Sequence, residues 1–229
     1  MSYRLQEYPD REFMMMDVAH VLVGALNEAL MANDRASIAV PGGSTPAPIF
    51  DVLCAADLDW SKVTVLPTDD RWVPETSPHS NAQLIRKHLL VERAAAAQYQ
   101  PLYLEGQDGP DCEDRLSDAV APHLPLSVAF LGMGSDMHTA SLFPGDAVLK
   151  SGARHDDQHN VHFVPVPGLD PKVARMTLTA SVLNDAMAKH IVITGAEKRA
   201  ALEAARRSND PYQAPISAVF SDATVHWAE

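Results

Sequence analysis

Short apolar segments typical of strands alternate along this chain with longer segments whose apolar residues have helical spacing. The clearest strand candidates lie at residues 37–40, 62–67, 126–131 and 189–194. The helical candidates lie at about 14–31, 81–93, 112–121 and 196–207. This alternation predicts a parallel sheet with helices on both faces, because two neighbouring parallel strands need a long crossover between them.

Weaker segments extend the same pattern. Strands are also predicted at 161–166 and 176–179, a short one at 100–104, and a last one at 217–220 that closes the sheet. A length of 229 residues suits one well-buried α/β domain, or at most two small ones. We expect a single domain over residues 1–229, with a doubly wound, mostly parallel, Rossmann-like sheet.

The charge balance limits the classes of partner. Lysine plus arginine number 18 and aspartate plus glutamate number 30, so the formal charge is 18 − 30 = −12. Nucleic acid and anionic membranes are therefore not expected partners, since a protein needs a positively charged surface to bind either of them. The first residues have no apolar signal core, and no run of about 18 apolar residues occurs. We expect a cytoplasmic protein.

Three polar loops follow predicted strands, at residues 41–46, 68–81 and 132–145. In an open parallel sheet, ligands bind at the carboxyl ends of the strands, so these loops are expected to meet at one site. An anionic ligand of so acidic a protein would need a local cluster of cations there. Arg175, at the start of a strand, and Lys198, just after one, are candidates, although a residue in either place is more often a surface charge.

The first loop is Pro41-Gly42-Gly43-Ser44-Thr45-Pro46. Two glycines allow close approach of a ligand to the backbone, and two hydroxyls add donors for an anion. Ser44 or Thr45 is also expected to cap a helix that has Pro46 in its first position. The pattern matches neither the P-loop nor the dinucleotide fingerprint, so phosphate binding and a simple tight turn both stay open.

The other two loops carry side chains suited to catalysis. Asp69, Asp70 and Arg71 could position a polar substrate, or form a solvated acidic turn. Asp136 and His138 lie two residues apart on a loop opened by glycines. Histidine suits general-base work near neutrality, and a carboxylate beside it would fix the orientation of its ring. A surface histidine next to an aspartate is the alternative.

Taken together, these segments resemble the 6-phosphogluconolactonase family. GGSTP, TDDRWVP with SNA downstream, LGMGSDMHTASLFPG, RMTLT and GAEK occur in the family's order and spacing, and DPYQAPISAVF is similar to its closing segment. HTASLFPG is the specific part. The related glucosamine-6-phosphate deaminases share the first loop and a similar run up to the histidine, but continue differently after it.

The resemblance implies a role for each matching residue. The sugar phosphate would be held by Gly42, Gly43, Ser44, Thr45, Arg175 and Lys198. The lactone end would face Asp69 and Arg71, and the reacting carbon would lie between Asp136 and His138. The family usually has glutamate at the position of Asp70 and glycine at the position of Met137, and the second difference puts the geometry of that loop in question.

The implied reaction is hydrolysis of 6-phospho-D-glucono-1,5-lactone in the pentose phosphate pathway, with His138 as the general base. A δ-lactone is an activated ester, so no metal and no cofactor are expected. The only expected partner is the small-molecule sugar-phosphate lactone; the sequence leaves the oligomeric state open and is compatible with a monomer. A glucosamine-6-phosphate deaminase/isomerase and a non-catalytic sugar-phosphate sensor stay as alternatives.

Three histidines, His155, His159 and His162, have a spacing that would suit metal ligands on a helix. The segment around them is very polar and has no apolar helical face, and His162 is expected to begin a strand. We therefore predict a solvated loop rather than a metal site.

Overall fold

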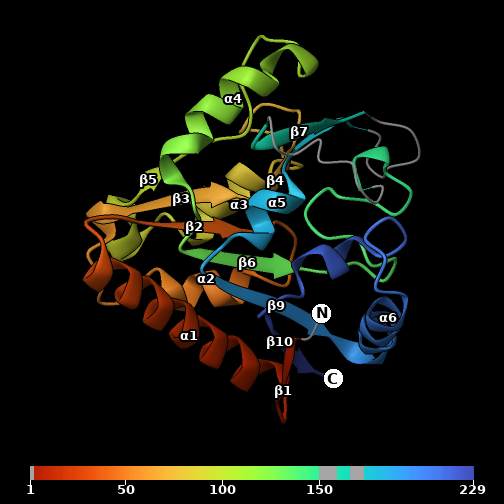
Figure 1. Cartoon of the computed structure of the whole chain (residues 1–229). Coiled ribbons are helices and arrows are strands. Elements are labelled where there is room, and N and C mark those ends of the chain that lie inside the picture. The colour runs from red at the N-terminus through yellow and green to blue at the C-terminus, as the bar shows by residue number, and fades with distance from the viewer. Residues whose placement is uncertain (1–2, 150–158, 166–172) are drawn as a thin grey trace.

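A parallel sheet runs through the centre of the computed structural model, which describes residues 3–149, 159–165 and 173–229 (Figure 1). Its strands are β1 (Arg4–Glu7), β2 (Ala36–Val40), β3 (Val63–Pro67), β5 (Gln98–Tyr99), β6 (Val128–Gly132), β9 (Ala188–Thr194) and β10 (Thr224–Ala228). They lie in the order β1-β10-β9-β6-β2-β3-β5, and every pair is parallel. The predicted α/β class with a mostly parallel sheet is confirmed.

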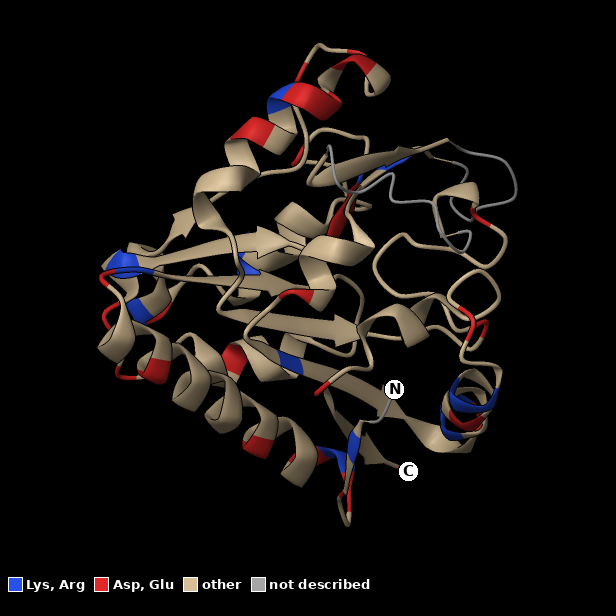
Figure 2. Ribbon diagram, viewed as in Figure 1, with Lys and Arg blue, Asp and Glu red and all other residues tan. Residues whose placement is uncertain are grey.

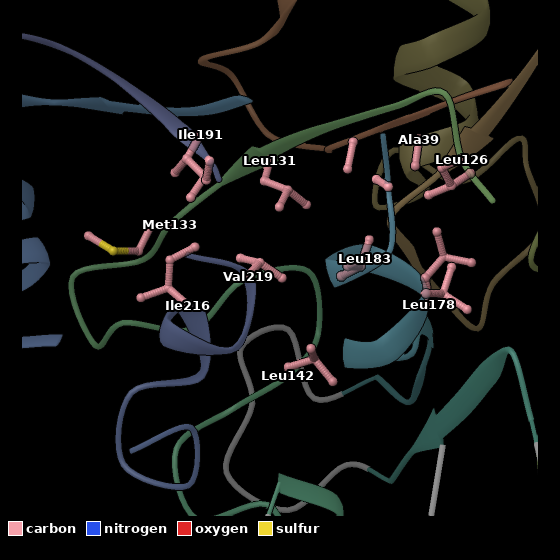
Figure 3. Close-up of a cluster of buried hydrophobic side chains, with 14 of the residues drawn as sticks. Ala39, Leu126, Leu131, Met133, Leu142, Leu178, Leu183, Ile191, Ile216 and Val219 are labelled. Atoms are coloured by element: carbon pink, nitrogen blue, oxygen red, sulfur yellow. The ribbon is translucent and has the colours of Figure 1, made fainter. Parts of the chain in front are cut away.

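Helices cover both faces of the sheet, as predicted. One face packs against α1 (Arg11–Ala32), α2 (Ala47–Leu53) and α3 (Asn81–His88), and the other against α4 (Glu113–Val120), α5 (Ala180–Asn184) and α6 (Gly195–Ser208). Successive strand residues alternate between the two cores: Ala39 belongs to one, Ile38 and Val40 to the other. Figure 3 shows part of the core that contains Ala39.

The helix α1 is long and apolar enough to cross a membrane by length and composition alone. One side of it is buried in the core against β2, β6 and β10, through Met14, Val18, Ala19, Leu22, Leu26 and Ala29. A stripe with this spacing is the buried face of an amphipathic helix. α1 is therefore a core helix of this fold.

A second, antiparallel sheet lies beside the first. It consists of β4 (Asp69–Arg71), β8 (Arg175–Leu178) and β7 (Val161–Val164), in that order. The strands predicted at 161–166 and 176–179 exist as β7 and β8, but they do not join the parallel sheet, and residue 166 lies outside the described residues. Their partner β4 is short and charged, so its sequence resembled a loop.

The ends of several elements differ from the prediction. The segment 217–220 is not a strand: residues 215–219 form a 3₁₀ turn, and β10 and β1 complete the sheet instead. Both are short and contain polar residues, which weakens their strand pattern.

The strand expected at 100–104 lies at Gln98–Tyr99. The third helix ends at His88, not at 93, and Glu92 has a φ of +49°, which no α-helix accommodates. The short helix α5 was not predicted.

The order in which the chain adds strands to the sheet switches sides between β2 and β6, which are parallel neighbours. From β2 the chain crosses to β3 on one side, and from β6 it proceeds to β9 on the other. Such a switch point leaves a crevice outside the carboxyl ends of the two strands. The predicted polar loops at 41–46 and 132–145 leave these same two ends.

Candidate functional site

A cavity of about 300 Å³ lies at this switch point. Nine of the ten predicted site residues line it: Gly42, Gly43, Ser44, Thr45, Asp69, Arg71, His138, Arg175 and Lys198. The tenth, Asp136, contacts the cavity-lining His138. The fold therefore brings together residues from five separate segments of the chain, and their predicted roles can be compared with their geometry.

The glycine loop after β2 forms one wall of the cavity. Gly43 has a φ of +92°, which favours glycine. The predicted cap is wrong: α2 begins at Ala47 with Pro46 as its N-cap, and neither hydroxyl caps it. Ser44 and Thr45 line the cavity instead, and neither side chain caps the helix.

The second loop is a buried strand rather than a solvated acidic turn. Successive residues of β4 point to opposite sides, because side chains alternate along a strand. Asp69 and Arg71 therefore line the cavity, whereas Asp70 points the other way, toward α3. Only one of the two adjacent carboxylates faces the cavity.

Asp70 anchors the first turn of α3. Its carboxylate accepts hydrogen bonds from the backbone N–H groups of Arg71 (2.8 Å), Asn81 (2.6 Å) and Ala82 (2.9 Å), and from the hydroxyl of Ser80 (3.0 Å). Burial raises the pKa of Asp70 to about 6, although the backbone donors favour the charged form. The position that departs from the family's usual glutamate thus has a structural role here.

Asp69 is held from three sides. Its carboxylate accepts a hydrogen bond from Ser141 Oγ, and its Oδ2 lies 3.8 Å from Arg175 Nη1. The side-chain amide of Asn81 donates to its backbone carbonyl (2.7 Å). Asp69 is 6% exposed and Arg175 7%, so this is a buried ion pair in a fixed position at the cavity wall.

The small antiparallel sheet places two arginines next to each other. Arg71 on β4 pairs with Arg175 on β8 in the strand register. Burial, and then the charge of Arg71, lower the pKa of Arg175. The Nε atoms of both arginines are buried and lack a hydrogen-bond partner within the described part of the chain. Two guanidinium groups this close favour an anion between or beside them.

The cavity is locally positive in a strongly acidic protein. Its charged lining residues are Arg71, Arg175 and Lys198 against Asp69 alone, which gives 3 − 1 = +2 with His138 neutral. Figure 2 shows much of the acidic charge at the periphery, along α1 and α4, whereas β2 and β6 carry no charged residue. The predicted local cluster of cations is therefore present at the switch point.

His138 and Asp136 form the pair expected from the third loop. His138 Nδ1 lies 2.5 Å from Asp136 Oδ1, and the backbone N–H of His138 also donates to this oxygen (3.2 Å). The contact occupies Nδ1, so Nε2 is the ring nitrogen left for chemistry in the cavity. The pair lies directly against Gly134, where a Cβ would be 2.2 Å from His138 Nδ1 and 2.5 Å from Asp136 Oδ1. Gly134 is thus required by the pair.

Met137 keeps the backbone conformation that its family's glycine would favour. Its φ is +71°, a region that costs a residue with a Cβ about 1–2 kcal/mol. Its side chain packs against the core cluster that contains Leu142 and does not line the cavity. The backbone N–H of Ile216 donates to the Met137 carbonyl (3.1 Å), which helps to hold the loop. The methionine therefore leaves the space beside His138 open.

The specific run after His138 contains positioning contacts that the sequence analysis did not assign. Thr139 Oγ1 donates to the carbonyl of Gly132 (2.9 Å), and Ser141 donates to Asp69. The ring of Phe143 lies 5.0 Å from the His138 ring and 5.7 Å from the Arg175 guanidinium carbon. The run HTASLFPG thus connects the histidine, the aspartate and the arginine, which single residues in a sequence do not reveal.

The three histidines considered as metal ligands have other surroundings. His155 lies outside the described residues, whereas His159 contacts Asp114 (2.8 Å) and His162 lies in β7 near Glu113 (3.5 Å). No group of three or more His, Cys, Asp or Glu suited to a metal ion occurs over residues 3–149, 159–165 and 173–229.

Comparisons with known proteins show the family to which the chain belongs. A family model described as glucosamine-6-phosphate isomerases/6-phosphogluconolactonase matches residues 9–227. A 6-phosphogluconolactonase of Caulobacter vibrioides is 35% identical over 226 residues, covering 99% of this chain and 97% of the relative. One of Rhizobium meliloti is 38% identical over 212 residues, covering 90% of each.

Solved structures of 6-phosphogluconolactonases have the same fold as this chain. The crystal structure of a 6-phosphogluconolactonase from Shewanella baltica matches with a TM-score of 0.91 and 28% identity, covering 100% of this chain and 98% of that one. A monomeric glucosamine-6-phosphate deaminase, at 17% identity and a TM-score of 0.80, shares the fold. The chain is therefore an enzyme of the 6-phosphogluconolactonase family, within the glucosamine-6-phosphate isomerase/6-phosphogluconolactonase superfamily.

Proposed function

We propose that this chain hydrolyses 6-phospho-D-glucono-1,5-lactone to 6-phospho-D-gluconate. The observation that carries the proposal is a cavity of charge +2 that is lined by the His138 ring, with Asp136 fixed behind that ring. A dianionic sugar phosphate suits the cations, and a neutral ester suits a histidine base. The relatives named 6-phosphogluconolactonase, at 35% and 38% identity, support the same substrate.

The phosphate is assigned to the glycine loop and to two cations. The backbone N–H groups and hydroxyls from Gly42 to Thr45 offer short-range donors, and Arg175 and Lys198 supply charge from other elements. Binding at the phosphate places the lactone carbonyl at a fixed distance, and this lowers the entropic part of the barrier.

His138 acts as the general base in the proposed mechanism. Its Nε2 takes a proton from water while the water oxygen bonds to the lactone carbonyl carbon, and Arg71 stabilises the negative charge that develops on the carbonyl oxygen. The bond between this carbon and the ring oxygen then breaks. The leaving ring oxygen takes the proton from the imidazolium, and Asp136 stabilises the charged ring throughout.

No metal or cofactor enters this scheme, because the ring-opening of an activated ester needs only a base and a charged donor for the oxyanion. The product places the enzyme in the pentose phosphate pathway, and we propose a cytoplasmic location for it. The sugar-phosphate lactone is the partner that we propose for the cavity, and a chain of charge −12 is not suited to binding nucleic acid or anionic membranes.

The test is a direct assay of the purified full chain. Lactone generated in the cuvette should disappear faster than its spontaneous hydrolysis, with 6-phosphogluconate as the product. Glucosamine 6-phosphate, with ammonia release as the readout, is the parallel substrate. Ammonia release without lactone turnover would assign the deaminase reaction instead, and binding of the sugar phosphate without turnover of either would assign a sensor.

A further inference from the structure

The side chain of Asn81, the first residue of α3, lines the cavity and has no catalytic assignment so far. Asn81 is 3% exposed, so its amide is almost fully removed from solvent and must find its partners within the protein. It lies on a different element from every residue assigned to the substrate. Its contacts therefore decide whether the Asn81 side chain only packs in the protein interior or also positions residues of the site.

The amide of Asn81 holds two substrate-facing residues at once. Its Oδ1 accepts a hydrogen bond from Arg71 Nη1, and its Nδ2 donates to the Asp69 backbone carbonyl (2.7 Å) and lies 3.4 Å from Asp69 Oδ1. This orientation of the amide is fixed by chemistry, because the reverse would place an NH₂ group against a guanidinium. Within the described chain, this is the one hydrogen bond that holds the guanidinium of Arg71.

The same side chain also lies against the phosphate loop. A Cβ added to Gly42 would be 1.9 Å from Asn81 Oδ1 and 2.2 Å from its Cγ. Real contacts never come this close, so position 42 has to be a glycine because Asn81 occupies the space. One amide group therefore contacts both the glycine loop and Arg71.

The backbone of Asn81 is itself fixed. Its N–H donates to the buried carboxylate of Asp70 (2.6 Å), which also binds the next N–H of α3, that of Ala82 (2.9 Å). Asp70 and Arg71 are adjacent on β4, so the strand that carries Arg71 also anchors the residue that orients it. The arrangement is a closed loop of contacts, which is rigid compared with a single hydrogen bond.

We propose that Asn81 is a positioning residue that aims the Arg71 guanidinium at the lactone carbonyl and sets its distance from the phosphate loop. The proposal rests on the lactonase function proposed above. It predicts that the loss from removing Asn81 is expressed mainly through Arg71, and that Gly42 and Asn81 constrain each other sterically.

A double-mutant cycle tests the first part. Asn81→Ala should lower kcat about tenfold to a hundredfold with KM changed less than about threefold, since contacting residues in one network couple by amounts of this size. In an Arg71→Ala background, the same change should lower kcat less than about threefold further. If Asn81→Ala does not fold, Asn81→Ser, which is also too short to reach Arg71, replaces it in the same cycle.

A matched control is Asn33→Ala. Asn33 follows α1, and its side chain likewise donates to a backbone carbonyl, that of Ala29 (3.3 Å), but it does not line the cavity. This variant should keep the wild-type kcat even if its thermal midpoint falls. A second readout is Gly42→Ala, which should weaken phosphate-dependent binding in the wild type and do so far less in the Asn81→Ala background.

The positioning role would be overturned if Asn81→Ala acted independently of both Arg71→Ala and Gly42→Ala, or if a folded Asn81→Ala protein kept the wild-type kcat. Either result would leave the lactonase function intact. Absence of lactone turnover by the wild-type chain would instead reject the function itself. The two failures are therefore distinguishable in one set of measurements.

Discussion

The imidazole of His138 lies against the α-carbon of Gly134, so closely that a Cβ at this position would be 2.2 Å from Nδ1 and 2.3 Å from Cε1. The backbone N–H of Gly134 also donates to the carbonyl of His138 (3.0 Å), which closes the loop on itself. The position of the base is therefore set by a contact with the Gly134 backbone as well as by the Asp136 carboxylate.

Gly134→Ala should displace the ring of His138 and separate it from Asp136. We expect kcat for lactone hydrolysis to fall about a hundredfold or more, approaching the loss from removing a general base. The control is Gly24→Ala, at a helix surface where an added Cβ meets nothing within 4 Å. A folded Gly134→Ala enzyme as active as the Gly24→Ala enzyme would show that this contact does not position the base.

His138→Ala removes the proposed base itself. We expect kcat to fall by about 10²–10⁴, the usual contribution of general-base catalysis. Spontaneous lactone hydrolysis sets the floor, so the rate must be measured against an enzyme-free reaction under the same conditions. Wild-type kcat in the folded variant would exclude His138 as the base.

Arg175→Ala and Lys198→Ala should act mainly on binding. Each removes a charge-assisted contact to the phosphate, of about 1.5–3 kcal/mol, so KM should rise about tenfold or more. Arg175→Ala also leaves buried Asp69 without its ion pair, so its folding must be checked first. The unphosphorylated gluconolactone is the control substrate, whose KM should change little. Unchanged KM for the phosphorylated lactone in both variants would place the phosphate elsewhere.

A buried chain of polar groups on the α1 side predicts how stability depends on pH. His190 Nδ1 lies 3.1 Å from His226 Nε2, and the Tyr8 hydroxyl joins His226 Nδ1 (2.8 Å) to Asp17 (2.7 Å). Burial lowers the pKa of both histidines to about 4, so in mild acid the unfolded chain binds protons that the folded chain does not. Their stabilisation is present above pH 6.5 and is lost as the pH falls toward 4.

The measurement is the free energy of unfolding in denaturant between pH 4 and 6.5. In wild type, each histidine contributes a slope of up to about 1.4 kcal/mol per pH unit. His190→Leu should have a visibly smaller slope. Burial raises the pKa of Asp70 to about 6, so protonation of Asp70 stabilises the fold at low pH, and this stabilisation is lost as the pH rises through 6. The Asp70 contribution therefore has the opposite slope, and it is the same in both proteins. Identical slopes would show that His190 titrates normally.

The sequence determined the main features of the fold because they are local. Apolar strands alternating with helices gave the parallel sheet, and the carboxyl ends of β2 and β6 carried the loops that line the cavity. The pair Asp136 and His138 could also be found, since two residues separated by one position on a tight loop meet without help from the rest of the chain.

Only the tertiary structure decided which charges meet. Arg71 and Arg175 lie far apart in the sequence and become neighbours through β4 and β8, which pair in a second sheet that hydrophobic periodicity could not predict. The assignment of Asp69 to the cavity and Asp70 to α3 depends on that pairing. The residues of β4 are polar and their pattern resembles a loop, so the pairing of β4 with β8 appears only once the chain is packed.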